Sequence, residues 1–340
     1  MTAVCDGEAL LFGHPLVWTG ATTVSAHQAT ALFVQPDPTY RPFKVANIGG
    51  VVGTVDQDRL AGLHVELGSS PPTSRMHSVL TAADTGSSRT ATTRVVLPQW
   101  IPDVAFFHLL SNLDRVGDRH GPGVVELRWG ARGTRSDGST WSLRRREKLA
   151  DRYDSTFWPA IKIADDLWSL FNNRFEAITI DDVQVSGTVD PAYVEAALVG
   201  LEKLGPAGRW QTVSRRTPLH LVAGSEVFLR GVLRSYRSAR LTRVQLSFVV
   251  PDSAGGTGRL SVFAGAPCFF CFESAGGHSF DELVRRIDRA PTGDTLRAVM
   301  RVSRQTPAGR QTFTRHVRTT APTAIYGNLG VDVQVVRSAG

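Results

Sequence analysis

The spacing of hydrophobic and polar residues divides the chain into three stretches. Residues 1–70 contain short apolar runs rich in Gly and Val, broken by Gly-Gly and Pro-Asp-Pro sequences. This pattern predicts short strands and half of a small β-barrel. A Pro-Pro-Thr-Ser linker starts at Pro71. We therefore expect a first domain over residues 1–70, a second over 71–185 and a third over 186–340.

The second stretch begins with the pattern of a strand and a helix. Residues 90–97 alternate as a strand does, and Pro98 ends the alternation. Residues 103–119 predict a helix capped by Asp103. Its apolar residues recur at three-residue spacing on one broad face: Val104, Phe107, Leu110, Leu113 and Val116.

A hairpin and a second helix follow in the same stretch. Residues 124–129 and 140–144 predict two paired strands, with a strong turn signal at 136–139. Residues 157–172 predict a helix whose apolar side is Ile161, Leu167, Trp168 and Phe171. The resulting order of strand, helix, hairpin, helix and strand is typical of an α+β domain.

The third stretch reads as repeated short strands separated by Gly-rich turns, which predicts an immunoglobulin-like β-sandwich. The expected strands cover residues 209–213, 220–222, 226–233, 243–250, 259–263 and 295–303. One helix over 279–289 interrupts them, with Ser279 and Glu282 forming a capping box. Its apolar residues would pack on a sheet: Phe280, Leu283, Val284 and Ile287.

The fold class predicted from these patterns is mainly β with an α+β middle. In chain order we expect a partial trypsin-like β-barrel core, an α+β domain and an immunoglobulin-like sandwich. Composition agrees with a globular chain, since 42% of the 340 residues are hydrophobic and 20% are charged. No apolar run approaches the roughly 20 residues needed to cross a bilayer as a helix, so we expect no membrane span.

The formal net charge is +7, because arginine is abundant. The excess is clustered over residues 144–146, 209–216 and 230–243. No nucleic-acid recognition motif accompanies the clusters, so we interpret them as solvated basic surface and do not expect nucleic acid as a partner. The alternative, a cytoplasmic nucleic-acid binder, rests on charge alone.

Three cysteines are too few for a disulfide framework. Cys268 and Cys271 have the spacing of a redox pair but lie in an apolar, strand-like run. They are interpreted as two buried small hydrophobic residues, or as a local disulfide in an exported protein. His278 adds one further potential ligand, but no second ligand pair stands at zinc-site spacing, so we expect no metal and no cofactor.

The candidate chemistry lies in the first stretch. Gly13-His14-Pro15 fixes a histidine on a stiff turn, and Asp56 or Asp58 offers a carboxylate that could orient its imidazole. At most one of the two acids is expected to meet His14. The alternative is a turn carboxylate paired with Arg59. His27 competes for the same site, although packing or hydrogen bonding is its simpler role.

These residues carry a family resemblance over residues 4–68. The stretch resembles the core of the SpoIVB-type serine peptidase family, in its actinobacterial branch. The matching sequences are Leu10-Leu11-Phe12-Gly13-His14-Pro15, Val24-Ser25-Ala26-His27 and the run from Gly53 to Gly62. The resemblance implies an exported or cell-envelope protein that hydrolyses peptide bonds with His14 as general base.

The nucleophile that this family uses is not found. Its serine lies in a motif of the Met-Ser-Gly-Ser-Pro kind, which the 340 residues do not contain. Ser25, Ser69 and Ser70 are possible substitutes, but no oxyanion-hole turn is recognisable beside them. The chain also begins as if within a strand, with no signal peptide, so we expect a late start codon or a fragment.

Two interpretations stay open. In the first, the chain is the downstream part of an exported serine peptidase, inactive as given, whose partner is a protein or peptide substrate. In the second, it is a catalytically dead relative that works as an extracellular binding or scaffolding protein. His108 and His120 have no carboxylate or cysteine at ligand spacing, so we interpret both as structural.

Overall fold

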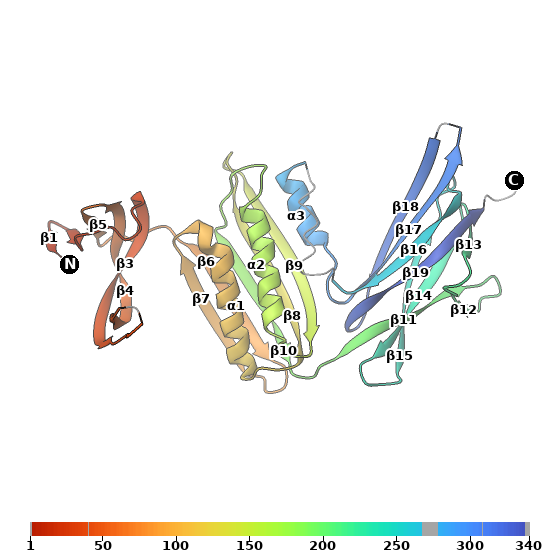
Figure 1. The fold of residues 1–340 in the computed structure, drawn as a ribbon, viewed down its shortest axis with the longest axis horizontal. Helices are drawn as coiled ribbons and strands as arrows, with labels where there is room; N and C mark the ends of the chain where they lie inside the picture. The colour runs from red at the N-terminus through yellow and green to blue at the C-terminus, as the bar shows by residue number, and fades with distance from the viewer. Residues whose placement is uncertain (1, 40, 267–277, 308, 337–340) are drawn as a thin grey trace.

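The structure is a computed structural model that describes residues 2–39, 41–266, 278–307 and 309–336. The mainly β fold predicted from the sequence is confirmed. Three sheets follow one another along the chain, and the helices of the described ranges lie beside the middle one (Figure 1). The cysteine pair expected at Cys268 and Cys271 lies outside the described residues.

The N-terminal sheet is antiparallel, with strand order β1-β2-β5-β4-β3. Its strands are β1 (Ala3–Cys5), β2 (Glu8–Leu11), β3 (Gly20–Gln35), β4 (Phe43–Arg59) and β5 (Gly62–Leu67). Its core is small: Ala9, Ala26, Val55, Leu63 and Val65. Residues 43–51 of β4 pair only with β3, so the end of the β3–β4 hairpin forms a two-stranded ribbon that extends past the rest of the sheet (Figure 1).

The middle sheet has the order β7-β6-β10-β8-β9. Its strands are β6 (Ser74–Ala82), β7 (Ser88–Val95), β8 (Gly123–Thr134), β9 (Thr140–Asp151) and β10 (Asp182–Asp190). The pair β6–β10 is parallel and the other pairs are antiparallel. The expected hairpin is therefore present as β8–β9, with longer strands than its sequence pattern indicated.

Two helices, α1 (Ile101–Gly117) and α2 (Phe157–Phe171), cover one face of this sheet, and η1 (Pro98–Trp100) leads into α1. The helix expected over 103–119 is present, but Trp100 occupies its N-cap position and makes no side-chain cap, so Asp103 is not the cap. Phe107 is 63% exposed, whereas Leu109 is fully buried. Residues three apart are turned by 300° around a helix, so a long run at that spacing leaves the buried face.

The apolar side expected for α2 needs a similar correction. Leu167 and Leu170 are fully buried, and Phe171 packs against the same core. Trp168 is 51% exposed, so it lies outside the buried face. Asp166 is buried instead, where Lys162 donates a hydrogen bond to its carboxylate.

The third sheet has nine strands among the described residues and curls into a half-barrel. Its main order is β15-β14-β11-β19-β16-β17-β18, with β12 beside β11 and β13 beside β19. The strands are β11 (Glu195–Leu204), β12 (Trp210–Thr212), β13 (Leu219–Val222), β14 (Glu226–Ser235), β15 (Leu241–Val249), β16 (Gly256–Ala264), β17 (Thr295–Thr306), β18 (Gly309–Thr320) and β19 (Ala324–Val336). All six expected strands are present, while β11, β18 and β19 were not expected.

Helix α3 (Phe280–Arg289) lies in the third stretch of sequence but packs on the middle domain. Ser279 is its N-cap as expected, since Ser279 Oγ accepts a hydrogen bond from the Glu282 amide at 3.2 Å, while the Glu282 carboxylate accepts from the amide of His278 at 2.8 Å. Phe280 is buried edge-on against Trp141 of β9, with ring centroids 5.4 Å apart. The middle core is therefore completed by a helix that follows β16 in the chain.

Candidate functional site

His14 lies on the loop between β2 and β3 and is exposed. Its ring stacks on Phe12 at 5.3 Å, and its Nδ1 lies 2.8 Å from the Pro15 carbonyl oxygen. Phe12 and Trp18 both have left-handed backbone conformations, with φ of 62° and 59°. Such conformations cost bulky residues free energy, so other contacts must hold this loop in place.

Asp58 holds the loop. Its side chain is buried, and its carboxylate accepts hydrogen bonds from the amides of Leu16 and Val17, both at 2.9 Å, and of Thr19 at 3.3 Å. Burial acts to raise the pKa of Asp58, but the backbone hydrogen bonds, that of Val17 first, lower it below its ordinary value. Asp58 is thus a positioning residue for the His14 loop and makes no contact with the His14 imidazole.

Asp56 contacts a different histidine. His64 of β5 donates from Nδ1 to Asp56 Oδ1 at 2.6 Å, and its Nε2 lies 3.3 Å from Glu8 Oε2. The hydrogen bond with Asp56, and next that with Glu8, raise the pKa of His64. The structure therefore brings neither expected acid to His14. The alternative partner, Arg59, instead donates to Gln57 at 2.9 Å.

Sequence reasoning missed His64. The β4–β5 register shifts between Val55 and Gln57, which leaves Asp56 as the extra residue of a bulge. Bulges re-aim side chains, and this one directs Asp56 to the strand that carries His64. The His-x-Glu sequence of β5 was visible, but a bulge position has no periodic signal that predicts it.

The candidate serines differ in their surroundings. Ser25 Oγ lies 3.0 Å from Nε2 of His27, and Nδ1 of His27 lies 3.0 Å from the Gly49 carbonyl oxygen. This is the one serine–histidine contact of the N-terminal sheet among the described residues. Ser69 Oγ forms hydrogen bonds with Thr54 Oγ1 of β4 and with the Glu66 carbonyl of β5, which hold the chain where β5 ends. Ser70 is exposed.

The two histidines of the middle domain lie apart from these residues. His108 is buried between Ser78 and Thr93, with its ring nitrogens 2.9 and 2.8 Å from their hydroxyl oxygens. Burial lowers the pKa of His108, so its neutral form is favoured there. It joins α1 to β6 and β7, which agrees with a structural role. His120 is exposed, 3.6 Å from the carboxylate of Asp154.

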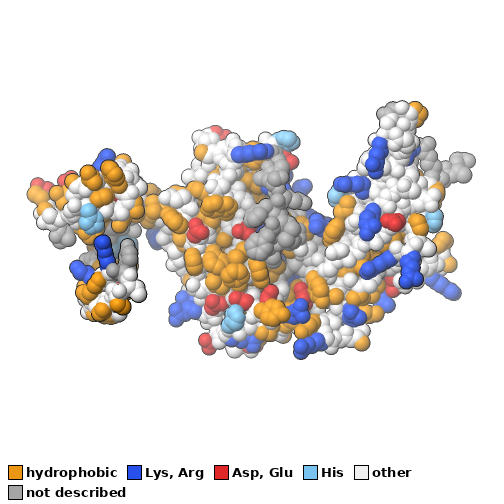
Figure 2. All heavy atoms as spheres, in the orientation of Figure 1, with side chains coloured by type: hydrophobic (Ala, Val, Ile, Leu, Met, Phe, Trp, Pro, Cys, Tyr) orange, Lys and Arg blue, Asp and Glu red, His pale blue; other side chains and the backbone are white. Residues whose placement is uncertain are grey.

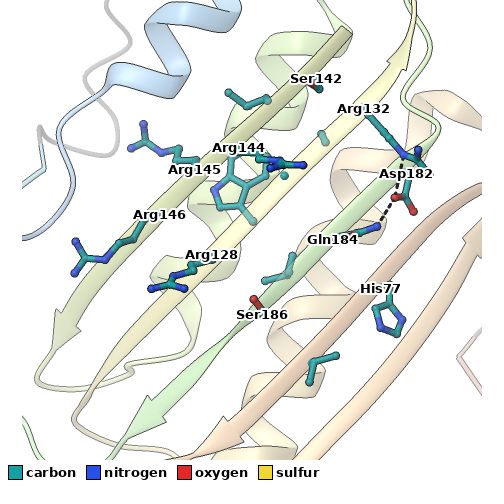
Figure 3. A pocket seen from close by; sticks show the side chains of 16 residues that line it. His77, Arg128, Arg132, Ser142, Arg144, Arg145, Arg146, Asp182, Gln184 and Ser186 are labelled. Carbon is teal, nitrogen blue, oxygen red and sulfur yellow. Dashed lines mark hydrogen bonds and ion pairs between the residues drawn. The ribbon is translucent and has the colours of Figure 1, made fainter. Parts of the chain in front are cut away.

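A second candidate region is the face of the middle sheet that the helices leave open. A hollow of about 740 Å³ lies there between β6, β10, β8 and β9 (Figure 3). Six arginines belong to this face, which we call the basic face: Arg75, Arg94, Arg128, Arg132, Arg144 and Arg146. Arg145 lies on the opposite face, buried against Glu147, so the cluster at 144–146 is divided between two environments.

Comparisons of the chain with protein-family models, with curated proteins and with solved structures found no match. Within the described ranges, none of the helices combines the length and apolar character that a membrane crossing requires. The same residues contain no group of three or more His, Cys, Asp or Glu side chains placed to hold a metal ion.

Proposed function

We propose that the N-terminal sheet is the histidine-bearing half of a SpoIVB-type serine peptidase core, in which His14 is the general base. In this proposal a second polypeptide segment completes a trypsin-like barrel and supplies the nucleophilic serine. The protein then acts outside the cytoplasm, on a protein or peptide substrate. The observation that carries the proposal is the unpartnered apolar surface of the β3–β4 ribbon.

The ribbon has no core of its own. Its large hydrophobic side chains are exposed: Leu32, Phe33, Val34, Phe43, Ile48 and Val51. Figure 2 shows hydrophobic side chains at the surface of the N-terminal sheet, including its far end. A two-stranded hairpin is marginally stable in water, and apolar patches of this kind mark contact sites. In this proposal the free edge of β3 pairs with a strand of the second segment, and the rest of that segment packs on the ribbon and buries these side chains.

The contacts of His14 support inactivity of the 340-residue chain alone. Asp56 is bonded to His64 and Asp58 to the loop backbone, so neither of the two expected carboxylates orients the His14 ring. Loss of triad members costs serine hydrolases several orders of magnitude in rate. Asp58 nevertheless fixes the loop on which His14 stands, so a completed core would receive the histidine in a defined position.

A fluorophosphonate probe tests the proposal. The native protein from its source cells and the recombinant 340-residue chain are labelled in parallel, and the labelled peptide is identified by mass spectrometry. We expect labelling of the native protein on a serine outside these 340 residues, and none of the recombinant chain. His14→Ala in the native protein should abolish labelling, whereas His120→Ala, a control at an exposed histidine, should not. Labelling of Ser25 in the recombinant chain would contradict the proposal.

A second candidate is a catalytically dead binding or scaffolding protein. The observation that favours it is the division of the chain into three sheets with separate cores. The cores of the middle and third sheets are large and are built from residues of this chain. Here the third sheet would act as the binding module; it is one continuous sheet whose edge strands β15 and β18 contact each other as it curls. An unlabelled native protein with no serine-bearing extension would favour this function.

A further inference from the structure

The basic face carries arginines placed opposite one another on neighbouring strands. Arg128 of β8 is directly opposite Arg146 of β9, and Arg75 of β6 is directly opposite Arg94 of β7. Like charges in such pairs destabilise a sheet. In each pair one arginine has a carboxylate partner within the protein, Arg75 at Asp182 and Arg146 at Asp294, so the charge of the other is left for an external anion.

Only part of this charge is neutralised within the protein. Asp182 accepts from Arg75 at 2.7 Å and lies 3.3 Å from Arg132, while Arg146 reaches Asp294 at 2.8 Å. Arg128 and Arg144 are exposed and have no ion pair among the described residues. These two guanidinium groups are therefore available to a ligand.

A glycine shapes the hollow between them. Gly130 is directly opposite Arg144 on β9 and Gln184 on β10, so no side chain rises from the centre of that row. Figure 3 shows Arg128, Arg144 and Arg146 on β8 and β9, with Gln184 and His77 on the two strands that follow across the sheet. Arg144 and Arg146 are two residues apart on one strand, which places their Cα atoms about 7 Å apart. Arg146 is paired with Asp294, so Arg144 is the unpaired arginine of this strand and Arg128 that of the neighbouring strand β8.

We propose that the basic face binds a phosphodiester or polyphosphate chain through Arg128 and Arg144. Guanidinium groups donate paired hydrogen bonds to phosphate oxygens, and two unpaired arginines on neighbouring strands suit a chain of anionic groups better than one isolated ion. The one aromatic ring among the lining residues besides His77 is Trp129, and it belongs to the buried core on the helix side. The face offers no platform for base stacking, so recognition is by charge and does not depend on nucleotide sequence.

Fluorescence anisotropy of the full chain measures this binding. The probes are a fluorescein-labelled single-stranded DNA of mixed sequence and, as competitors, inorganic polyphosphate and polyglutamate. The test variant is Arg128→Gln/Arg144→Gln, and the matched control is Arg215→Gln/Arg216→Gln, which removes the same charge from an exposed loop of the third domain. Thermal melting of both variants verifies their folding.

We expect the test variant to bind DNA roughly tenfold more weakly at low salt, with the slope of log K against log salt reduced by about 1.4 for the two lost contacts. The control should retain wild-type affinity. Competition by polyphosphate supports phosphate recognition in general, and DNA binding that polyphosphate does not displace assigns the ligand to nucleic acid. Equal losses in the two variants, no binding of either phosphate polymer, or equal competition by polyglutamate would each overturn the proposal. A failure here leaves the peptidase proposal unaffected, because the basic face shares no residue with the N-terminal sheet.

Discussion

His64 on β5 donates a hydrogen bond from Nδ1 to Oδ1 of Asp56 on β4 at 2.6 Å, while its Nε2 faces Glu8 on β2. The imidazole thus joins three neighbouring strands of the N-terminal sheet. Because that sheet has a core of only five buried hydrophobic residues, a polar contact of this kind contributes a larger share of its stability than it would in a large domain.

The protonation of His64 should make the stability of this sheet depend on pH. The pKa of His64 is raised in the folded state, by Asp56 first and then by Glu8. Its contribution to the free energy of unfolding is therefore complete below the unfolded pKa of about 6.5 and is lost as pH rises through the higher folded pKa. An NMR titration of the His64 ring should give a pKa above 6.5. Urea unfolding, monitored by hydrogen exchange of the β5 amides, should give a larger free energy of unfolding for this sheet at pH 6 than at pH 8.5.

The Asp56→Asn variant provides the control for this effect. The amide keeps the shape of the side chain but removes the charge, so the NMR pKa of His64 should fall and the stability of β5 should vary less with pH. An unchanged pKa in this variant would show that Asp56 is not the main partner of His64.

Asp58→Asn should release the loop that carries His14. The folded pKa of Asp58 is lowered because the amides of Val17, Leu16 and Thr19 outweigh the effect of burial. Its contribution to stability is thus present above the unfolded pKa of about 3.9 and is lost as pH falls through the lower folded pKa.

Limited chymotrypsin digestion at pH 7 measures the release. Phe12, Leu16 and Trp18 are cleavage sites within the loop, and we expect the variant to be cut there several-fold faster than the wild type. Asp84→Asn is the matched control, since Asp84 accepts a backbone hydrogen bond in a turn of another sheet. Equal cleavage of both variants would contradict a positioning role for Asp58.

Truncations on α1 test which of its faces is buried. Leu109 is fully buried in the core of the middle domain, so Leu109→Ala should lower the free energy of unfolding of that domain by about 2–5 kcal/mol. Phe107 is largely exposed, and Phe107→Ala should change it by no more than about 0.5 kcal/mol. Denaturant titrations of the two variants make the comparison. A larger loss of unfolding free energy for Phe107→Ala than for Leu109→Ala would show that the face expected from the sequence is the buried one.

Elements fixed by local interactions are those that the sequence predicts well. The β8–β9 turn is one: Asp137 accepts from the amide and hydroxyl of Ser139, and Gly138 takes a φ of 84°. The cap of α3 is another, contained within four residues. Both depend on side chains close in sequence, so a short motif was enough to locate them.

Contacts between distant segments were not predictable in the same way. Strands β11 and β19 pair in parallel across more than a hundred residues, and their sequences give no signal of each other. In the candidate site, the sequence predicts that Asp56 or Asp58 orients His14, but a bulge and a loop give each acid another partner. On β9, the alternation of sides separates Arg144 and Arg146 from Arg145, which a count of charges along the chain does not show.

The Phe280→Ala variant tests whether α3 stabilises the middle domain or the third domain. The Phe280 ring is buried against Trp141, and the carbonyl of Ile287 at the end of the helix accepts a hydrogen bond from the buried Arg145 of β9. Phe280→Ala would leave a cavity beside Trp141 and should cost about 3–5 kcal/mol. Because these contacts all belong to the middle core, hydrogen exchange should become faster in β8 and β9 and stay unchanged in β16 and β17. Asp288→Ala, on the exposed side of the same helix, should alter neither. Faster exchange confined to the third sheet would show instead that α3 belongs with the segment that precedes it in the chain.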